Sequence, residues 1–81
     1  MKVSVVPILE SIGLQKGKYF PNVTNDQEVE KVISFIQNSK MNEFEIILYE
    51  GSSRITTLTY LGEKSRKDFC NRVEYFLLKN M

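Results

Sequence analysis

The residues that could bind a ligand most directly are polar and cationic side chains before the last apolar stretch of the chain. Four of them are consecutive: Lys64, Ser65, Arg66 and Lys67. A helix is expected to begin here, and cations in a first helical turn oppose the helix dipole by about 0.3–1 kcal/mol each. Free backbone amides at a helix start attract anions. The pattern therefore predicts an anion-binding site for a phosphate, a nucleic-acid backbone or an acidic protein surface. The alternative is solvated charge, partly offset by Glu63 and Asp68.

Other catalytic chemistry has few residues to draw on. The chain has no histidine and a single cysteine, Cys70, so it lacks the usual general base and the ligands for a tetrahedral zinc site. We expect no metal, no cofactor and no enzymatic activity. Cys70 itself lies near Arg66 and Lys67, which could lower its thiol pKa. At the margin of an apolar helix stripe, however, a free cysteine is more often a small hydrophobic residue, and we favour that interpretation.

Two groups of carboxylates remain as catalytic candidates. One lies along an expected strand (Glu43, Glu45, Glu50) and the other at an expected helix start (Asp26, Glu28, Glu30). Acidic residues are common at helix starts because of the helix dipole, and elsewhere on solvated surfaces. We interpret both groups in this way.

The composition is that of one small cytoplasmic domain. The 81 residues, of which 42% are hydrophobic, predict a single domain over residues 1–81. A net charge of +1 argues against a general polyanion binder. One cysteine cannot form an internal disulfide, which favours a reducing compartment. No segment has the run of apolar residues expected of a membrane span.

Two helices have clear signals. Val29, Val32, Ile33 and Ile36 have helical spacing and predict a helix from about Asp26 to Asn38, capped by Thr24 or Asn25. The last helix is expected to begin after Gly62, with Ser65 as its cap, and to end near Lys79. Its apolar stripe is Phe69, Val73, Phe76 and Leu77, with Tyr75 and Leu78 outside it.

A β-hairpin is expected between these helices, from Phe44 to Glu50 and from Arg54 to Leu61, with a type II′ turn at Gly51-Ser52. A two-residue turn with regular pairing places Phe44, Ile46, Leu48 and Ile55 on one face. It places Ile47, Tyr49, Leu58 and Tyr60 on the other. Both faces then carry large apolar groups, whereas a solvated antiparallel sheet usually has one polar face.

The N-terminal segment has two interpretations. Val5, Ile8, Leu9 and Ile12 have helical spacing, and Gly13-Leu14 resembles a helix stop. The residues before Pro7 could instead form an edge strand. We favour a short helix over residues 2–12, followed by a loop from Gln15 to Val23 whose aromatic residues fold back onto the core. The predicted fold is a small α+β domain with the order α-α-β-β-α and an antiparallel hairpin packed against helices.

Two helices can cover only one face of a hairpin well. Either the N-terminal segment and the Tyr19-Phe20 loop cover the other face, or a partner does. The leading hypothesis is a non-catalytic interaction module, a small regulator, inhibitor or adaptor, that binds another protein or a second copy of itself. Its predicted binding residues are Ile47, Tyr49, Leu58, Tyr60, Tyr75 and Leu78. The alternative is nucleic-acid binding through the basic helix start, with Tyr49 and Tyr60 stacking on bases.

Overall fold

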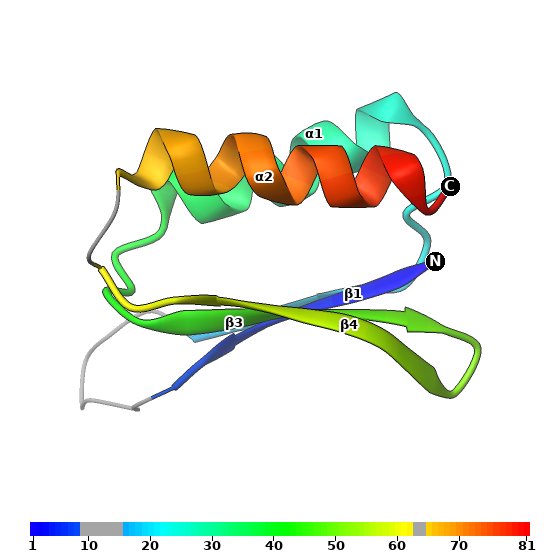
Figure 1. Ribbon diagram of the computed structural model, residues 1–81, viewed down its shortest axis with the longest axis horizontal. Coiled ribbons are helices and arrows are strands. Elements are labelled where there is room, and N and C mark those ends of the chain that lie inside the picture. Colours follow the sequence, from blue (N-terminus) through cyan, green and yellow to red (C-terminus); the bar gives the residue numbers. More distant parts are fainter. Residues whose placement is uncertain (9–15, 63–64) are drawn as a thin grey trace.

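The computed structural model describes residues 1–8, 16–62 and 65–81. They form a four-stranded antiparallel sheet and two helices, so the α+β class is confirmed. The order is β-β-α-β-β-α rather than α-α-β-β-α. The elements are β1 (Lys2–Pro7), β2 (Lys18–Phe20), α1 (Asp26–Asn38), β3 (Phe44–Glu50), β4 (Ser53–Tyr60) and α2 (Arg66–Lys79). Figure 1 shows the two helices on one side of the sheet and the two chain ends at the same end of the molecule.

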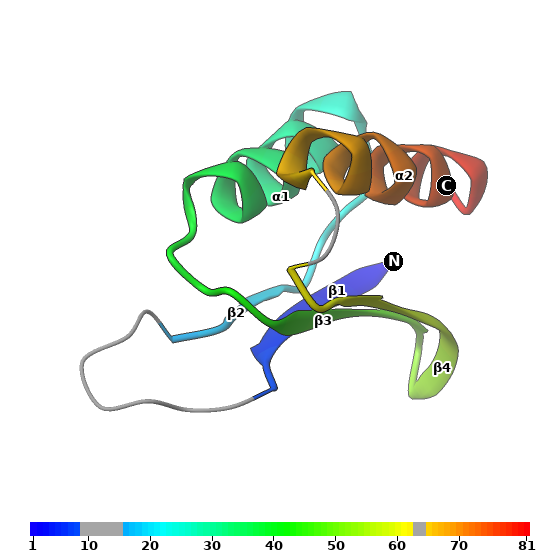
Figure 2. The same cartoon turned by 60° about the vertical axis from the view of Figure 1, so that its left-hand side comes forward.

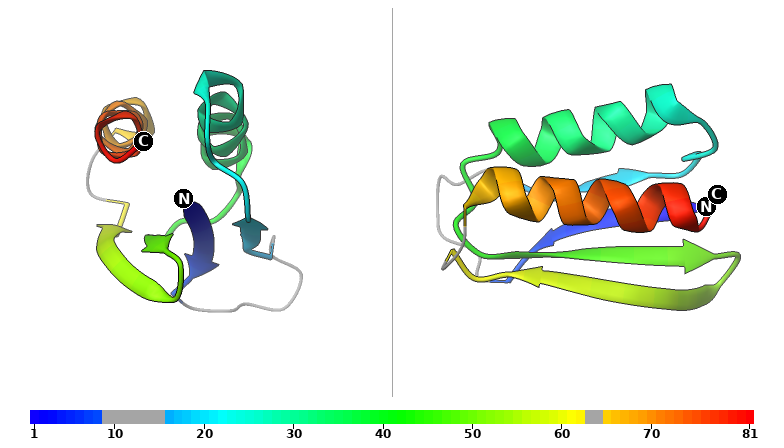
Figure 3. Two further views of the ribbon diagram at one scale, coloured as in Figure 1. Left: turned by 90° about the vertical axis from the view of Figure 1, so that its right-hand side faces the viewer. Right: turned by 45° about the horizontal axis from the view of Figure 1, so that its top comes forward.

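The strand order β2-β1-β3-β4 arises from two β-β-α units placed side by side. Each unit is an antiparallel pair of strands followed by a helix, and the first strands of the two units, β1 and β3, pair in the centre. The helices run in opposite directions, with α1 over the β2 side of the sheet and α2 over the β4 side (Figure 3). The sequence has no visible repeat that would predict the two similar units.

The core lies between the sheet and the helices. From the sheet come alternate residues, because successive side chains of a strand point to opposite faces: Val3, Val5, Phe44, Ile46, Leu48, Leu58 and Tyr60, all of them buried. The helices contribute Val29, Val32, Ile36, Phe69, Cys70, Val73 and Leu77. The apolar stripes predicted for both helices therefore face the sheet. Ile33 and Phe76, at the edges of these stripes, are partly buried against the core.

Both helix starts are set by local side-chain caps, as the sequence predicts. Asn25 accepts a hydrogen bond from the backbone amide of Glu28 at 3.0 Å. Ser65 accepts one from the amide of Asp68, also at 3.0 Å. Each cap satisfies one amide that has no partner within its helix. The observed bounds of the two helices match the predicted ones.

The predicted N-terminal helix is wrong, because residues 2–7 form the strand β1. It is not an edge strand, since it pairs with both β2 and β3. Strand pairing on two sides satisfies its backbone groups, and Val3 and Val5 both enter the core. Pro7 is the last residue of β1 and lies beyond the residues that pair with β2. The predicted helix stop at Gly13-Leu14 lies outside the described residues.

Part of the expected loop from Gln15 to Val23 is the short strand β2, which Figure 2 shows beside β1 at one edge of the sheet. Gly17 precedes it, and any side chain there would collide with the carbonyl oxygen of Val5. Only one of the two loop aromatics folds onto the core as expected. Phe20 is buried, whereas Tyr19 is 52% exposed.

The hairpin has the predicted two-residue turn but not the predicted pairing beyond it. Glu50 pairs with Ser53 across Gly51-Ser52, and Gly51 has a φ of 62°, as a type II′ turn requires. Next, Tyr49 pairs with Arg54, but Leu48 pairs with Thr56. Ile55 is therefore the extra residue of a β-bulge. Every β4 residue beyond the bulge points to the face opposite to the one that regular pairing predicts.

Candidate interaction surface

The sheet face opposite the helices, here called the open face, is the first candidate site. No described helix or strand covers this face (Figures 1 and 3). The strand registers arrange its side chains in three rows across the sheet. The first row is Lys2, Tyr49 and Arg54; the middle row is Tyr19, Ser4, Ile47 and Thr57; the third row is Val6, Glu45 and Thr59.

The open face combines exposed apolar groups with charges at its two ends. Tyr19 is 52% and Val6 is 40% exposed, whereas Ile47, between its row neighbours, is only 7% exposed. The first row carries the cations Lys2 and Arg54, and the third row carries Glu45. Among the described residues none of these three charges has an ion-pair partner. The face is therefore polarised along the strands, with its large apolar side chains distributed among the charged ones.

A shallow hollow lies beside the first row. It is lined by Lys2, Ser4, Tyr19, Tyr49, Gly51 and Ser52. Two tyrosines and a lysine thus contribute to one concave region at the turn end of the sheet. Such a set of groups can pack against an apolar side chain or stack on a planar ring, while the lysine attracts an anion.

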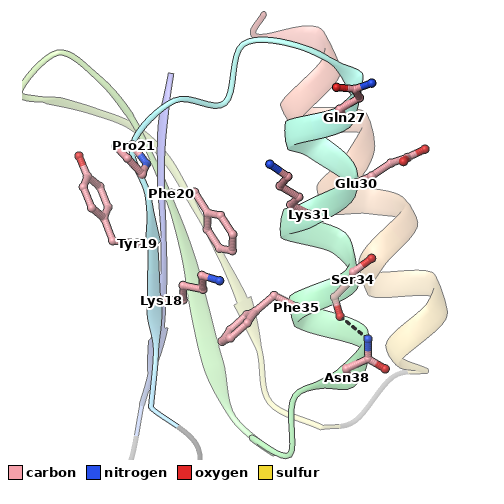
Figure 4. A pocket seen from close by; sticks show the side chains of 10 residues that line it. All are labelled: Lys18, Tyr19, Phe20, Pro21, Gln27, Glu30, Lys31, Ser34, Phe35 and Asn38. Atoms are coloured by element: carbon pink, nitrogen blue, oxygen red, sulfur yellow. Dashed lines mark hydrogen bonds between the residues drawn. The ribbon is translucent and has the colours of Figure 1, made fainter.

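A second candidate site is the groove between β2 and α1, shown in Figure 4. Phe20 and Phe35 form its floor, with their rings in edge-to-face contact and their centroids 5.9 Å apart. The Lys18 ammonium lies 5.2 and 5.8 Å from the two ring centroids. Tyr19 points away from this groove, toward the open face (Figure 4). The cation–π contacts cover the two rings, which leaves the groove less apolar than its floor alone suggests.

The six predicted binding residues fall into three places. Ile47 and Tyr49 lie on the open face, as proposed. Leu58 and Tyr60 are in the core, 4% and 8% exposed, and are not available to a partner. Their placement follows from the bulge at Ile55, which turns both of them toward the helices.

The remaining two predicted residues lie on α2, on the other side of the molecule from the open face. Tyr75 is 60% exposed, and its ring contacts Phe76 and lies 5.9 Å from the Lys79 ammonium. Leu78 lies at a shallow hollow between the helices that Asp26, Glu30 and Glu74 also line. The sequence hypothesis had joined both residues to the hairpin in one surface, and the structure separates them.

Arg66 has a different role from the predicted anion binding. Its guanidinium donates hydrogen bonds to the carbonyl oxygens of Ile36, Ser39 and Met41, at 2.8, 2.8 and 2.7 Å. These carbonyls belong to the last turn of α1 and the segment after it, where a cation also complements the helix dipole. The same guanidinium lies 5.4 Å from the Phe44 ring centroid and 5.2 Å from that of Tyr60. Arg66 thus connects the start of α2 to the end of α1.

Of the other members of the predicted anion site, the structure describes Ser65 and Lys67. Ser65 is exposed, and its hydroxyl is used as the helix cap. Lys67 is exposed on the first turn of α2. Lys64 lies outside the described residues. The Arg66 contacts account for one cation of the helix start, and anion binding by Ser65 and Lys67 stays a prediction.

Cys70 lies deep in the core rather than at its margin, with 1% of its surface exposed. Burial raises the pKa of its thiol above the ordinary value of 9.0, because the charged thiolate would lose its hydration. The nearby Arg66 lowers this pKa and Glu74 raises it, both by less than burial does. The thiol is therefore kept neutral, which favours the interpretation of Cys70 as a small hydrophobic residue.

The sequence hypothesis missed Lys2, Ser4, Val6 and Tyr19 on the open face. The signal was the alternation in Lys2-Val3-Ser4-Val5, where polar and apolar residues follow one another with the period of a strand. It was outweighed by helical spacing that depends on Leu9 and Ile12, which lie outside the described residues.

Comparison of the chain with protein-family models gave no match, and neither the curated proteins nor the solved structures contain a significant match to it. Among the described residues, no group of three or more acidic or cysteine side chains is placed to hold a metal ion. No described helix has both the length and the apolar composition needed to cross a membrane.

Proposed function

We propose that this chain is a non-catalytic protein-interaction module that binds a protein partner through the open face of its sheet. The observation that carries the proposal is the placement of both helices on one side of the sheet, which leaves Val6, Tyr19, Ile47 and Tyr49 on the other side without a covering element among the described residues. A free cysteine in the core supports a reducing, cytoplasmic environment.

The composition of the open face supports a protein partner. Tyrosine is among the residues enriched at protein interfaces, because it offers a large apolar ring and a polar end. Burial of a large apolar side chain contributes about 1.5–3 kcal/mol, so Tyr19, Tyr49 and Val6 together could supply several kcal/mol to a complex. The charges at the two ends of the face would set the orientation of the partner.

The test places a photo-crosslinking amino acid at one of two tyrosines, half-buried Tyr49 on the open face or exposed Tyr75 on α2. With benzoylphenylalanine in place of Tyr49, illumination of cells that express the chain should give a covalent protein adduct that survives nuclease treatment. The matched control replaces Tyr75, which is exposed on the opposite side of the molecule. Adducts of equal yield from both positions, or none from Tyr49, would contradict the proposal.

Single-stranded nucleic acid is the second candidate partner, and the first row of the open face favours it. There Tyr49 lies between Lys2 and Arg54, so a base could stack on the ring while phosphates meet the cations. The net charge of +1 and the presence of Glu45 on the same face count against it. The nucleic-acid hypothesis made from the sequence also used Tyr60, which is buried, and Arg66, whose guanidinium binds carbonyls in the last turn of α1 and the segment after it.

The nucleic-acid alternative has a direct test. Fluorescence anisotropy of a labelled oligothymidylate, titrated at low salt, should remain unchanged if the partner is a protein. A rise in anisotropy that Arg54→Glu abolishes and Lys67→Glu leaves intact would favour nucleic acid instead. Lys67 is the control because it is an exposed cation remote from the open face.

A further inference from the structure

The charges on the open face are arranged so that the face is complementary to itself. We infer that the partner is a second copy of this chain, packed sheet to sheet, with a two-fold axis that lies between the sheets and perpendicular to the strands. The inference rests on the proposed function, since it names the partner of the same surface. The inferred axis fixes which rows of the two copies face each other, so reversal of the charges in these rows tests it.

The two-fold axis follows from the position of the three rows. The axis lies along the middle row. Rotation about it places each strand over the same strand of the second copy, in the opposite direction, so that the first row of one copy faces the third row of the other. Tyr49 and Glu45 both belong to β3, in the first and third rows. Glu45 of each copy therefore lies opposite Tyr49 of the other, between the first-row cations Lys2 and Arg54, which belong to the neighbouring strands.

The other face-to-face arrangement is disfavoured by the same charges. A two-fold axis parallel to the strands would place the first row on its own copy, so that two Lys2 and two Arg54 side chains gather at one end. At the other end Glu45 would meet Glu45. Like charges brought together in an interface cost free energy and suppress that arrangement. Only the axis perpendicular to the strands pairs opposite charges at both ends.

The middle row is suited to contact with itself. In the inferred dimer Tyr19, Ser4, Ile47 and Thr57 each lie over the same residue of the other copy. Ile47 is already enclosed by its row neighbours, so the second sheet would add a layer above it. Packed sheets lie about 10 Å apart, a spacing that medium-sized side chains from two faces can fill.

The size of the face predicts a weak dimer. Strand spacing of about 4.8 Å and a rise of about 3.3 Å per residue give the ten residues of the three rows an area of about 320 Å² per copy. The total of about 640 Å² is below the about 1,200–2,000 Å² of stable specific complexes and within the range of weak, transient ones. We therefore expect a dissociation constant in the micromolar range, and one that increases with ionic strength because charges hold the two ends together.

The experiment is analytical ultracentrifugation of the full chain and two charge-reversal variants. Glu45→Arg and Arg54→Glu should each weaken dimerisation at least tenfold, because each places like charges at both ends of the homodimer. An equimolar mixture of the two variants should form a heterodimer, since residue 45 of each copy then again faces an opposite charge at residue 54 of the other. Lys79→Glu, a reversal on the far end of α2, should leave the dimer unchanged. Circular dichroism checks that each variant is folded.

Several outcomes would overturn the inference. A chain that stays monomeric to millimolar concentration excludes the dimer but leaves the proposed function intact if Tyr49 still crosslinks to another protein. A dimer that both reversals leave unchanged uses some other surface. A mixture of the two variants that does not associate contradicts the inferred axis. If a reversal prevents folding, the salt dependence of the wild-type dissociation constant remains decisive, and a constant that does not change with salt contradicts the charge pairing.

Discussion

The two faces of the hairpin differ more in the structure than the amino-acid composition of the two strands suggests. Both strands carry apolar residues at successive positions, yet the side toward the helices receives five of the large ones and the rows of the open face only Ile47 and Tyr49. Phe44, Tyr60 and Phe69 form a cluster of rings there, with centroids 5.0 to 5.6 Å apart. On the open face each row has at most two large apolar residues, separated by Ser, Thr or a charge.

One bulge determines which tyrosine lies in the core and which lies on the open face. Tyr49 lies before the bulge, on the open face, and Tyr60 lies after it, in the core. Without the extra residue at Ile55, Tyr60 and Leu58 would join Tyr49 on the outside. The helices would then lose two of their contacts on β4.

The largest expected effect comes from substituting these two tyrosines in turn. Tyr60→Ala should lower the free energy of unfolding by about 3–5 kcal/mol, as truncation of a buried aromatic residue does. Tyr49 is half-buried on the open face. Tyr49→Ala should therefore lower the free energy of unfolding by only about 1 kcal/mol or less. Urea denaturation of both variants measures the difference. Equal losses would mean that the two faces are equally important to the fold.

The sequence predicts correctly those elements whose signals are local. Caps and apolar stripes at 3.6-residue spacing predicted α1 and α2 to the residue, and Gly51-Ser52 predicted the turn. These signals depend on neighbours within about four residues. For the same reason, a regular pairing was the natural expectation beyond the turn, and nothing in Ser53-Arg54-Ile55 marks the bulge.

The parts that could not be predicted depend on contacts distant in the sequence. β1 becomes a strand because β3, some forty residues later, and β2 satisfy its backbone groups on both sides. The three residues of β2 have no strand signal apart from one aromatic pair. The composition of the open face depends on β1, β2 and the bulge as well as on the hairpin. The sequence therefore places Ile47, Tyr49, Glu45 and Arg54 on this face correctly but misses its β1 and β2 residues.

A second, smaller effect compares two adjacent cations on α2. Arg66→Met should lower the free energy of unfolding by about 2–3 kcal/mol, because three carbonyls in the last turn of α1 and the segment after it lose a charged donor. Lys67→Met removes an exposed cation and should change it by less than about 0.5 kcal/mol. Arg66→Lys should restore only part of the loss, since one ammonium cannot reproduce the planar guanidinium fork. If the two Met variants are equally stable, Arg66 does not connect the helices.

The last comparison has the smallest expected effect on stability and concerns the access of water to the two sides of the sheet. It is measured as the rate at which a thiol on each side reacts. Cys70, on the covered side, should react with a thiol reagent only as fast as the protein unfolds. The variant Thr57→Cys in a Cys70→Ala background places a thiol on the open face, where it should react much faster than Cys70 at concentrations below those of the inferred dimer. Comparable reaction rates would show that the helices do not seal their side of the sheet.

The same thiol gives a pH test of the covered side. Because burial raises the pKa of Cys70 in the folded chain, the unfolded chain releases this proton at lower pH than the folded chain. The stabilising contribution of the buried neutral thiol is thus fully present below the unfolded pKa, near 9, and is lost as the pH rises through the folded value. The free energy of unfolding should therefore fall more steeply with pH in wild type than in Cys70→Ala at alkaline pH. Parallel curves for the two proteins would mean that water reaches the thiol, and that the helices do not keep their side of the sheet dry.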